Sequence, residues 1–187
     1  RVLFRSHQSV LALTVPQLPT YAPKPRRRFL RISKQFSVVP AKKLPMGIAQ
    51  IGKAFRNEIT PRNFTFRSRE FEQMEMQYFV DPEDGMKYFD EWLEVRKKFF
   101  QSIGIPAQKI RLKEHGPGEL AHYARKAFDI EVEFPFGWQE VEGIHHRGDF
   151  DLSQHEQFSG EDMKYFDEQT RKKYVPHVVE TSIGADR

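Results

Sequence analysis

The sequence has 187 residues, with 30 Lys and Arg against 26 Asp and Glu and a net charge of +4 at pH 7. The length suits one domain or most of one. A hydrophobic content of 39% with 13% aromatic residues is enough for a core, which excludes a chain that is disordered throughout. The absence of cysteine excludes a disulfide scaffold, a Cys-based zinc site and a thiol nucleophile. No apolar run approaches the roughly 18 residues of a spanning helix, so we expect no membrane segment.

The charge is unevenly distributed along the chain. Residues 1–50 carry ten Lys or Arg and no Asp or Glu, which leaves 20 basic and 26 acidic residues in 51–187. Such asymmetry suggests a nucleic-acid-binding arm, a targeting segment or a stretch foreign to the fold. Five prolines interrupt any helix or central strand in residues 1–40, so we expect a disordered segment there. The same prolines argue against the amphipathic helix of a transit peptide.

Two strands are predicted first, over residues 48–55 and 71–80, joined by a polar loop. The second strand alternates with period two, which places Gln73, Glu75 and Gln77 on one face.

A helix is predicted over 81–103, with Asp81 as its N-cap and Gly104 ending it. The further predicted elements are a helix over 118–127, strands over 129–134 and 137–144, a helix over 160–173 and a strand over 175–183. Because several strands are connected as hairpins, we expect a mainly antiparallel sheet with helices on one side, which is an α+β domain.

Residues 55–75 hold the densest group of charges, with four arginines among several glutamates. Arg56 and Glu58 are two residues apart on a strand and therefore share a face. Arginine suits bidentate contact with phosphate, and nearby carboxylates could hold a divalent cation or an amine. By spacing alone, a mixed-charge surface hairpin is the favoured alternative.

Two further features carry ionisable groups. His145 and His146 are adjacent and should point to opposite faces of a strand, and no HExxH spacing is present, so a metalloenzyme is a minor hypothesis. Glu140 and Glu142 are predicted to share one strand face. The sequence has no P-loop, no GxGxxG and no GxSxG, which argues against a glycine-rich phosphate loop and a serine hydrolase.

Three segments together resemble the class II aminoacyl-tRNA synthetases. FRNE at 55–58 with FRSREFEQME at 66–75 resembles their motif 2, and ETSIGADR at 180–187 resembles their motif 3. The segment 109–152 resembles the dimeric type of glycine–tRNA ligase, and the resemblance extends from about Lys42 to the end of the sequence. It implies an incomplete class II catalytic domain, an antiparallel sheet flanked by helices.

The resemblance implies an ATP site with two catalytic arginines. Arg56 would contact the α-phosphate and the glycine carboxylate region, and Arg187 the γ-phosphate and adenine. Phe66 would stack on adenine, and Glu58 would lie near its amino group. Glu140 would meet Mg²⁺ through ATP. The full ATP-binding set implied is Arg56, Asn57, Glu58, Phe66, Arg67, Ser68, Arg69, Glu70, Phe71, Glu140, Val141, Gly184, Ala185, Asp186 and Arg187.

The resemblance also implies a glycine pocket in which Glu75 pairs with the substrate ammonium. The implied set is Phe71, Glu72, Gln73, Met74, Glu75, Glu180, Thr181, Ser182, Ile183 and Gly184. Glycine activation is in-line attack of a carboxylate on the α-phosphorus of ATP, so the protein positions groups and neutralises charge without a nucleophile of its own. The implied partners are glycine, ATP, Mg²⁺ and tRNA(Gly), in a cytoplasmic protein that is a homodimer at full length and has no membrane contact.

The family's RPETAQ segment is absent before Lys42. With permitted synonymous codons, residues 16–43 can be read in another frame as a sequence that contains RPETAQ. RVLFRS at 1–6 equals a translation of a DNA string that resembles a common sequencing-adapter end. We therefore expect residues 1–41 to be non-native, as adapter followed by frameshifted sequence, and 42–187 to be a partial catalytic domain. Such a fragment should be weakly active or inactive alone.

Two alternatives from other classes remain open. One is a synthetase-like nucleotide-binding module that does not charge tRNA. The other is a nucleic-acid-binding protein that uses a basic arm over residues 24–43.

Overall fold

The computed structural model describes residues 9–12 and 43–186. In chain order the elements are β1 (Ser9–Ala12), β2 (Met46–Phe55), η2 (Phe64–Phe66), β3 (Glu70–Val80), α2 (Gly85–Ser102), η3 (Ala107–Lys109), β4 (Ile110–Glu114), β5 (Lys126–Phe134), β6 (Gly137–Gly148), α3 (Phe150–Ser159), β7 (Tyr165–Phe166), β8 (Lys173–Tyr174) and β9 (His177–Gly184).

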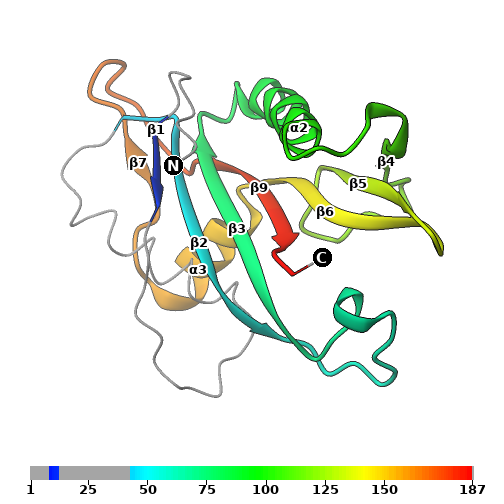
Figure 1. The fold of residues 1–187 in the computed structure, drawn as a ribbon. Helices are drawn as coiled ribbons and strands as arrows, with labels where there is room; N and C mark the ends of the chain where they lie inside the picture. Colours follow the sequence, from blue (N-terminus) through cyan, green and yellow to red (C-terminus); the bar gives the residue numbers. More distant parts are fainter. Residues whose placement is uncertain (1–8, 13–42, 187) are drawn as a thin grey trace.

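Seven of these strands form one sheet in the order β1–β2–β3–β9–β6–β5–β4 (Figure 1). Every neighbouring pair is antiparallel except β1 with β2. The α+β class and the mainly antiparallel sheet are therefore confirmed. β1 falls within the segment expected to be disordered, and the rest of residues 1–41 lies outside the described residues.

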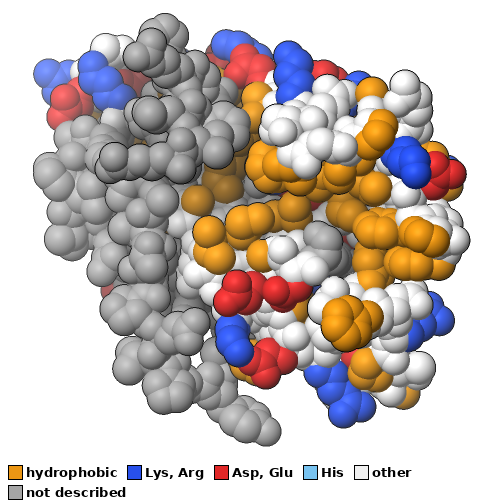
Figure 2. Space-filling model, viewed as in Figure 1, with side chains coloured by type: hydrophobic (Ala, Val, Ile, Leu, Met, Phe, Trp, Pro, Cys, Tyr) orange, Lys and Arg blue, Asp and Glu red, His pale blue; other side chains and the backbone are white. Residues whose placement is uncertain are grey.

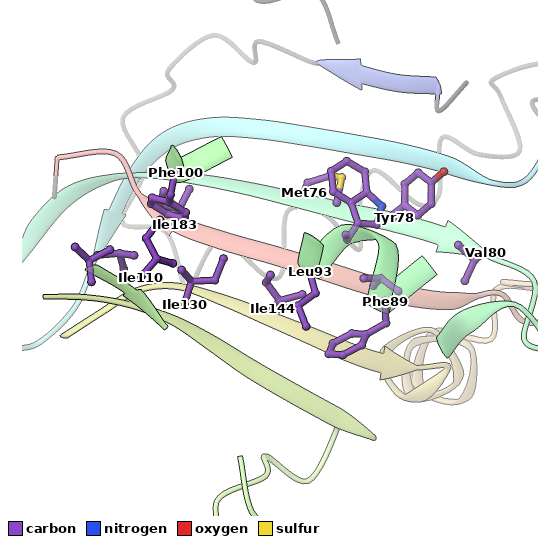
Figure 3. Close-up of a cluster of buried hydrophobic side chains, with 14 residues drawn as sticks. Met76, Tyr78, Val80, Phe89, Leu93, Phe100, Ile110, Ile130, Ile144 and Ile183 are labelled. Atoms are coloured by element: carbon purple, nitrogen blue, oxygen red, sulfur yellow. The ribbon is translucent and has the colours of Figure 1, made fainter. Parts of the chain in front are cut away.

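The main apolar core lies between α2 and one face of the sheet. In Figure 3, side chains from β3, β9, β6 and β5 converge on those of the helix. α2 contributes Phe89, Leu93 and Phe100, which recur at the spacing of one helical face. The alternation of β3 supplies Met76, Tyr78 and Val80 from the opposing strand face, as the sequence predicts.

The second helix, α3, covers the opposite face of the sheet at one end. Its Leu152 is buried with Met46 and Ile48 of β2, Phe79 of β3 and Val178 of β9. Phe79 belongs to the strand face that faces away from α2. The expectation of helices on one side was therefore wrong, because α2 and α3 lie on either side of the sheet (Figure 1).

Neither helix covers the whole face on which it lies. Ile51 and Phe55 of β2 are 60% and 57% exposed, beyond the area that α2 covers. In the same view as Figure 1, hydrophobic side chains form a band across the middle of the described surface, with charged side chains mainly around it (Figure 2). No helix of the described residues is long and apolar enough to cross a membrane.

Two predicted helices are wrong. Residues 118–127 form turns, with the amides of Glu119 and Leu120 donating to the carbonyl of Gly116, and β5 begins at Lys126. The other helix lies earlier than predicted, because Gly160 in the left-handed region (φ 70°) ends α3.

The hexapeptide MKYFDE occurs twice in the sequence, and its two copies have different structures. Its first copy, at 86–91, lies in α2, whereas the second, at 163–168, contains β7 and the start of the turn to β8. The carboxylate of Asp167 accepts hydrogen bonds from the amide of Gln169 and the hydroxyl of Thr170, which stabilises that turn. Local sequence alone therefore does not decide the structure of this string.

The prediction that Glu140 and Glu142 share a face is also wrong. Glu131 and Ile130, adjacent on β5, pair with Glu140 and Glu142 respectively, which leaves Val141 as an extra residue in a β-bulge. Adjacent residues of β5 lie on opposite faces, so their partners do too. Glu142 consequently lies on the α2 face, fully buried, and accepts a hydrogen bond from Arg96 Nε at 2.6 Å.

Burial raises the pKa of Glu142, and the adjacent Arg96 guanidinium opposes this rise. We expect Arg96→Met to destabilise the fold by about 3 kcal/mol at neutral pH, because it leaves a buried carboxylate without its charged partner. The deficit should shrink as pH falls, since a lone buried carboxyl can take up a proton. Chemical denaturation at several pH values measures this. Lys98→Met, on the exposed side of α2, is the control, and an equal effect of both substitutions at every pH would contradict the prediction.

As predicted, His145 and His146 point to opposite faces. His145 pairs in register with Glu180, and the His146 ring packs edge-on against Phe89 of α2 and His177 of β9. Burial, with the nearby His177 and Arg125, lowers the pKa of His146 from 6.5 to about 4.

Because its folded pKa is depressed, His146 is neutral in the fold and takes up a proton more readily when unfolded. Its contribution to stability is therefore present above pH 6.5 and lost as pH falls toward 4. When the pH falls from 7 to 4, the free energy of unfolding should decrease by about 2 kcal/mol less in a His146→Gln variant than in the unaltered chain. Parallel stability curves for the two proteins between pH 7 and 4 would contradict this.

Candidate functional site

The polar site lies on the face of the sheet that α3 covers only at one end. Strand register arranges its side chains in rows across the central strands. Nearest α3, Gln77, Glu180 and His145 share a row. The next row holds Glu75, Ser182, Gly143 and Asp129, and beyond it Gln73 pairs with Gly184.

A cleft of about 220 Å³ lies beyond Gln73, at the end of the site away from α3. Its lining comes from the segment between β2 and β3, from β3 itself, from the β6 end near the bulge, and from β9 with the residues after it. The lining residues are Arg56, Glu58, Thr65, Phe66, Arg67, Ser68, Phe71, Gln139, Glu140, Gly184 and Asp186. The volume is below the roughly 300–1,000 Å³ of ligand pockets, so a nucleotide-sized occupant would extend out of the cleft over the sheet.

Aromatic rings form one wall of the cleft. The Phe66 ring packs edge-on against Phe134 and Phe136, at centroid distances of 5.3 and 5.5 Å, and those two rings stack on each other at 5.2 Å. The loop turns sharply before Phe66, because Asn63 and Phe64 have positive φ angles of 56° and 53°. This turn and the ring contacts fix Phe66 at the cleft rim.

Arginines surround the cleft, and Glu58 organises two of them. Arg67 Nε donates to the Glu58 carboxylate at 2.8 Å, and Arg69 Nε donates to the Glu58 carbonyl at 3.0 Å. The Arg56 guanidinium lies 5.2 Å from the centre of the Phe71 ring. This leaves Arg56 beside an aromatic face at the cleft, where its charge can meet an anion.

A chain of hydrogen bonds runs along β3 and β9 from the cleft toward α3. The Gln73 amide donates to Ser182 Oγ at 2.5 Å and to Glu75 Oε2 at 3.2 Å. The Gln77 amide donates to Glu75 Oε1 at 2.8 Å and to Glu180 Oε2 at 3.0 Å. Two carboxylates are thus held by neutral amides on a buried surface.

Arg147 closes this chain at its α3 end. Its Nη1 lies 2.8 Å from Glu180 Oε2, its Nε donates to Asp151 of α3 at 2.6 Å, and its guanidinium carbon lies 3.9 Å from the centre of the Tyr123 ring. Burial alone would lower the pKa of Arg147. The bound Asp151 and the charge of Glu180 more than offset this, so the pKa lies above its usual value and the side chain stays charged.

Strand alternation divides the predicted site residues between the two faces. The residues of β3 and β9 that line the cleft or join the hydrogen-bonded chain share the α3 face. In contrast, Met74 and Ile183 pack in the α2 core, with Val141, and Thr181 pairs with Met76 on the same side. The side chains of these four residues therefore point away from the site.

The remaining predicted residues lie at or beside the cleft, and Asp186 is one of its lining residues. Asp186 accepts a hydrogen bond from the Glu72 amide at 2.8 Å, and the Glu72 carbonyl accepts one from Ala185 at 2.7 Å. The side chain of Glu70 pairs with Lys53, and Asn57 is exposed. Arg187 lies outside the described residues.

Some residues of the candidate site were not among the predicted ones. They are Thr65 and Gln139 in the cleft, and Gln77, Gly143, His145 and Arg147 along the sheet. The alternation of β3 already placed Gln77 beside Glu75, so a signal for it existed. Nothing local in the sequence marks Arg147, whose partners come from β9 and α3. Among the described residues, no three His, Asp or Glu are arranged to hold a metal ion by themselves.

The mainly antiparallel sheet agrees with a comparison to known protein families. Residues 23–187 match the family described as tRNA synthetase class II core domain (G, H, P, S and T). The chain belongs to that family, which confirms the class expected from motifs 2 and 3.

The similar proteins are bacterial glycine–tRNA ligases. The chain is 54% identical over 146 residues to the one from Geobacillus thermodenitrificans, and 53% identical over the same length to those from Geobacillus kaustophilus and Bacillus cereus. Each match covers 78% of this chain. The chain spans about a third of the length of these curated relatives, 31% of the first and 32% of the other two.

Gly143 sits in the centre of the polar face, where a side chain would not fit. A Cβ there would lie 2.9 Å from Cε1 of His145, which leans over it. We expect Gly143→Ala to destabilise the fold by about 1–3 kcal/mol, because the imidazole must move in a packed site. Gly52→Ala on β2 is the control, since its Cβ would meet nothing closer than 3.9 Å. Equal unfolding midpoints for the two variants would count against this account.

Proposed function

We propose that this chain is the catalytic core of a glycine–tRNA ligase, which activates glycine with ATP to glycyl-adenylate and transfers it to the 3′ end of tRNA(Gly). One observation carries the proposal. A cleft suited to a nucleotide continues, on the same strands, into a surface of buried carboxylates suited to an ammonium group. Phe71 of the cleft and Glu75 are four residues apart on β3, or about 13 Å along the strand.

The cleft supplies what ATP requires. Phe66 presents a ring for adenine, and Arg56 presents a guanidinium for a phosphate, in the roles that motif 2 implies. Mg²⁺ is usually bound by one or two carboxylates together with substrate phosphates. Glu140 fits that requirement at the cleft wall, and the ion would lower the cost of bringing the glycine carboxylate to the negatively charged phosphorus.

The carboxylates supply selectivity for glycine. Glu75 would accept the substrate ammonium, with Glu180 close by on β9. Glycine has no side chain to hold, so larger amino acids must be excluded by shape, as in a floor that contains Gly143 and Ser182. Such exclusion can exceed the roughly 1–3 kcal/mol that one methylene is worth in an apolar pocket.

The finer assignments rest on the resemblance to the class II synthetases. They are the binding roles given above for the ATP and glycine residues other than Met74, Val141, Thr181 and Ile183, with Arg187 as the second catalytic arginine. They also include a cytoplasmic enzyme that is a homodimer at full length. Adenylate formation followed by attack of the terminal ribose of tRNA completes the reaction without a covalent enzyme intermediate.

Calorimetric titration of the chain with ATP and Mg²⁺, then with glycine, tests the proposal. We expect ATP to bind and glycine to bind the ATP complex at least tenfold more tightly than L-alanine, because a methyl group must displace packed atoms. Arg56→Ala should weaken ATP binding by about tenfold or more, since it removes a charged contact to phosphate.

Glycine-dependent exchange of pyrophosphate into ATP then separates the alternatives. Slow exchange that requires glycine and is lost in Arg56→Ala supports the ligase. ATP binding with no response to any amino acid would instead favour the nucleotide-binding module. The basic arm of the nucleic-acid-binding alternative lies outside the described residues, apart from Lys43.

A further inference from the structure

Gln77 of β3 contacts two carboxylates at once. It follows Glu75 by two residues on the same strand face and pairs in register with Glu180 across the β3–β9 ladder. All three side chains are buried, at 7%, 5% and 3% exposed. Gln77 therefore connects a carboxylate of its own strand, β3, to a carboxylate of the neighbouring strand, β9.

The bridge uses the full donor capacity of the side chain. A glutamine amide nitrogen carries two protons, and Gln77 directs them to Glu75 Oε1 at 2.8 Å and Glu180 Oε2 at 3.0 Å. Without these donors, two buried carboxylates would face each other across the sheet and repel. The amide thus keeps them at a fixed separation without adding a charge.

The two carboxylates have different partners besides Gln77. Glu180 also meets the guanidinium of Arg147, which Asp151 and Tyr123 hold in place. Glu75 accepts on its other oxygen from the neutral amide of Gln73. Gln77 therefore joins the carboxylate that Arg147 contacts to the carboxylate that Gln73 contacts, and it fixes their relative orientation.

We propose that Gln77 is a positioning residue, which orients Glu75 and Glu180 to receive the ammonium group of a small amino acid. This inference rests on the proposed function and adds to it a residue that the resemblance did not supply. Gln77 acts through the two carboxylates, so its loss should weaken binding of the amino acid and leave the nucleotide cleft unchanged.

Gln77→Met keeps the length of the side chain and removes both donors. We expect the Kd for glycine, measured by calorimetry in the presence of ATP and Mg²⁺, to rise at least tenfold, because hydrogen bonds to charged groups are lost in a buried site. The Kd for ATP should change less than twofold. Gln101→Met, on the exposed side of α2, is the matched control and should alter neither constant.

A double-mutant cycle distinguishes positioning from a general structural role. In a Glu75→Gln background the carboxylate that Gln77 orients is gone, so adding Gln77→Met should cost less than a third of its effect in the original chain. If Gln77→Met does not fold, Gln77→Asn carries the test, since the shorter amide cannot reach both carboxylates and should show the same selective loss for glycine.

The outcomes separate the two proposals. ATP binding without glycine binding in the unaltered chain would overturn the proposed function, and this inference with it. Glycine binding that survives Gln77→Met undiminished, or an equal loss for ATP and glycine, would overturn the positioning role alone. Full additivity in the double-mutant cycle would also overturn it.

Discussion

The pairing of β9 between β3 and β6 is the constraint on which the rest of the structure depends. In its central part each of these strands has one mainly apolar and one mainly polar face, and the register brings like faces together across the three strands. The apolar faces form the core under α2, and the polar faces form the candidate site. A slip of one residue would exchange the two, so the stability of the fold and the composition of the site have the same origin.

The sequence predicts which side chains of a strand share a face, but it does not predict the contacts between distant segments. Period-two alternation in β3 is strong, and it correctly separates Gln73, Glu75 and Gln77 from the core residues between them. Motifs taken over as continuous strings ignore that alternation, which is why Met74 and Ile183 entered the glycine set although both pack under α2. Their backbone lies in the site strands, whereas their side chains stabilise the core.

The errors in secondary structure arise where tertiary context overrides local propensity. The second MKYFDE string becomes a hairpin because Asp167 stabilises a turn, and Gly160 has already ended α3. Residues before β5 have a helix-like pattern, but the strand pairs with both β4 and β6 and extends to Lys126. The importance of Arg147 depends on Glu180 and Asp151, which are 33 and 4 residues away in the chain, and only folding brings the first of them into contact.

The bulge at Val141 gives two nearby glutamates independent environments. On the α2 face, Glu142 accepts a hydrogen bond from Arg96 beneath the helix. On the opposite face, Glu140 lines the cleft. The extra residue uncouples the orientation of the β5–β6 hairpin tip from that of the sheet centre. Over evolutionary time, the tip could therefore acquire new cleft contacts by substitution or by loss of that residue, while the core beneath α2 keeps its pairing.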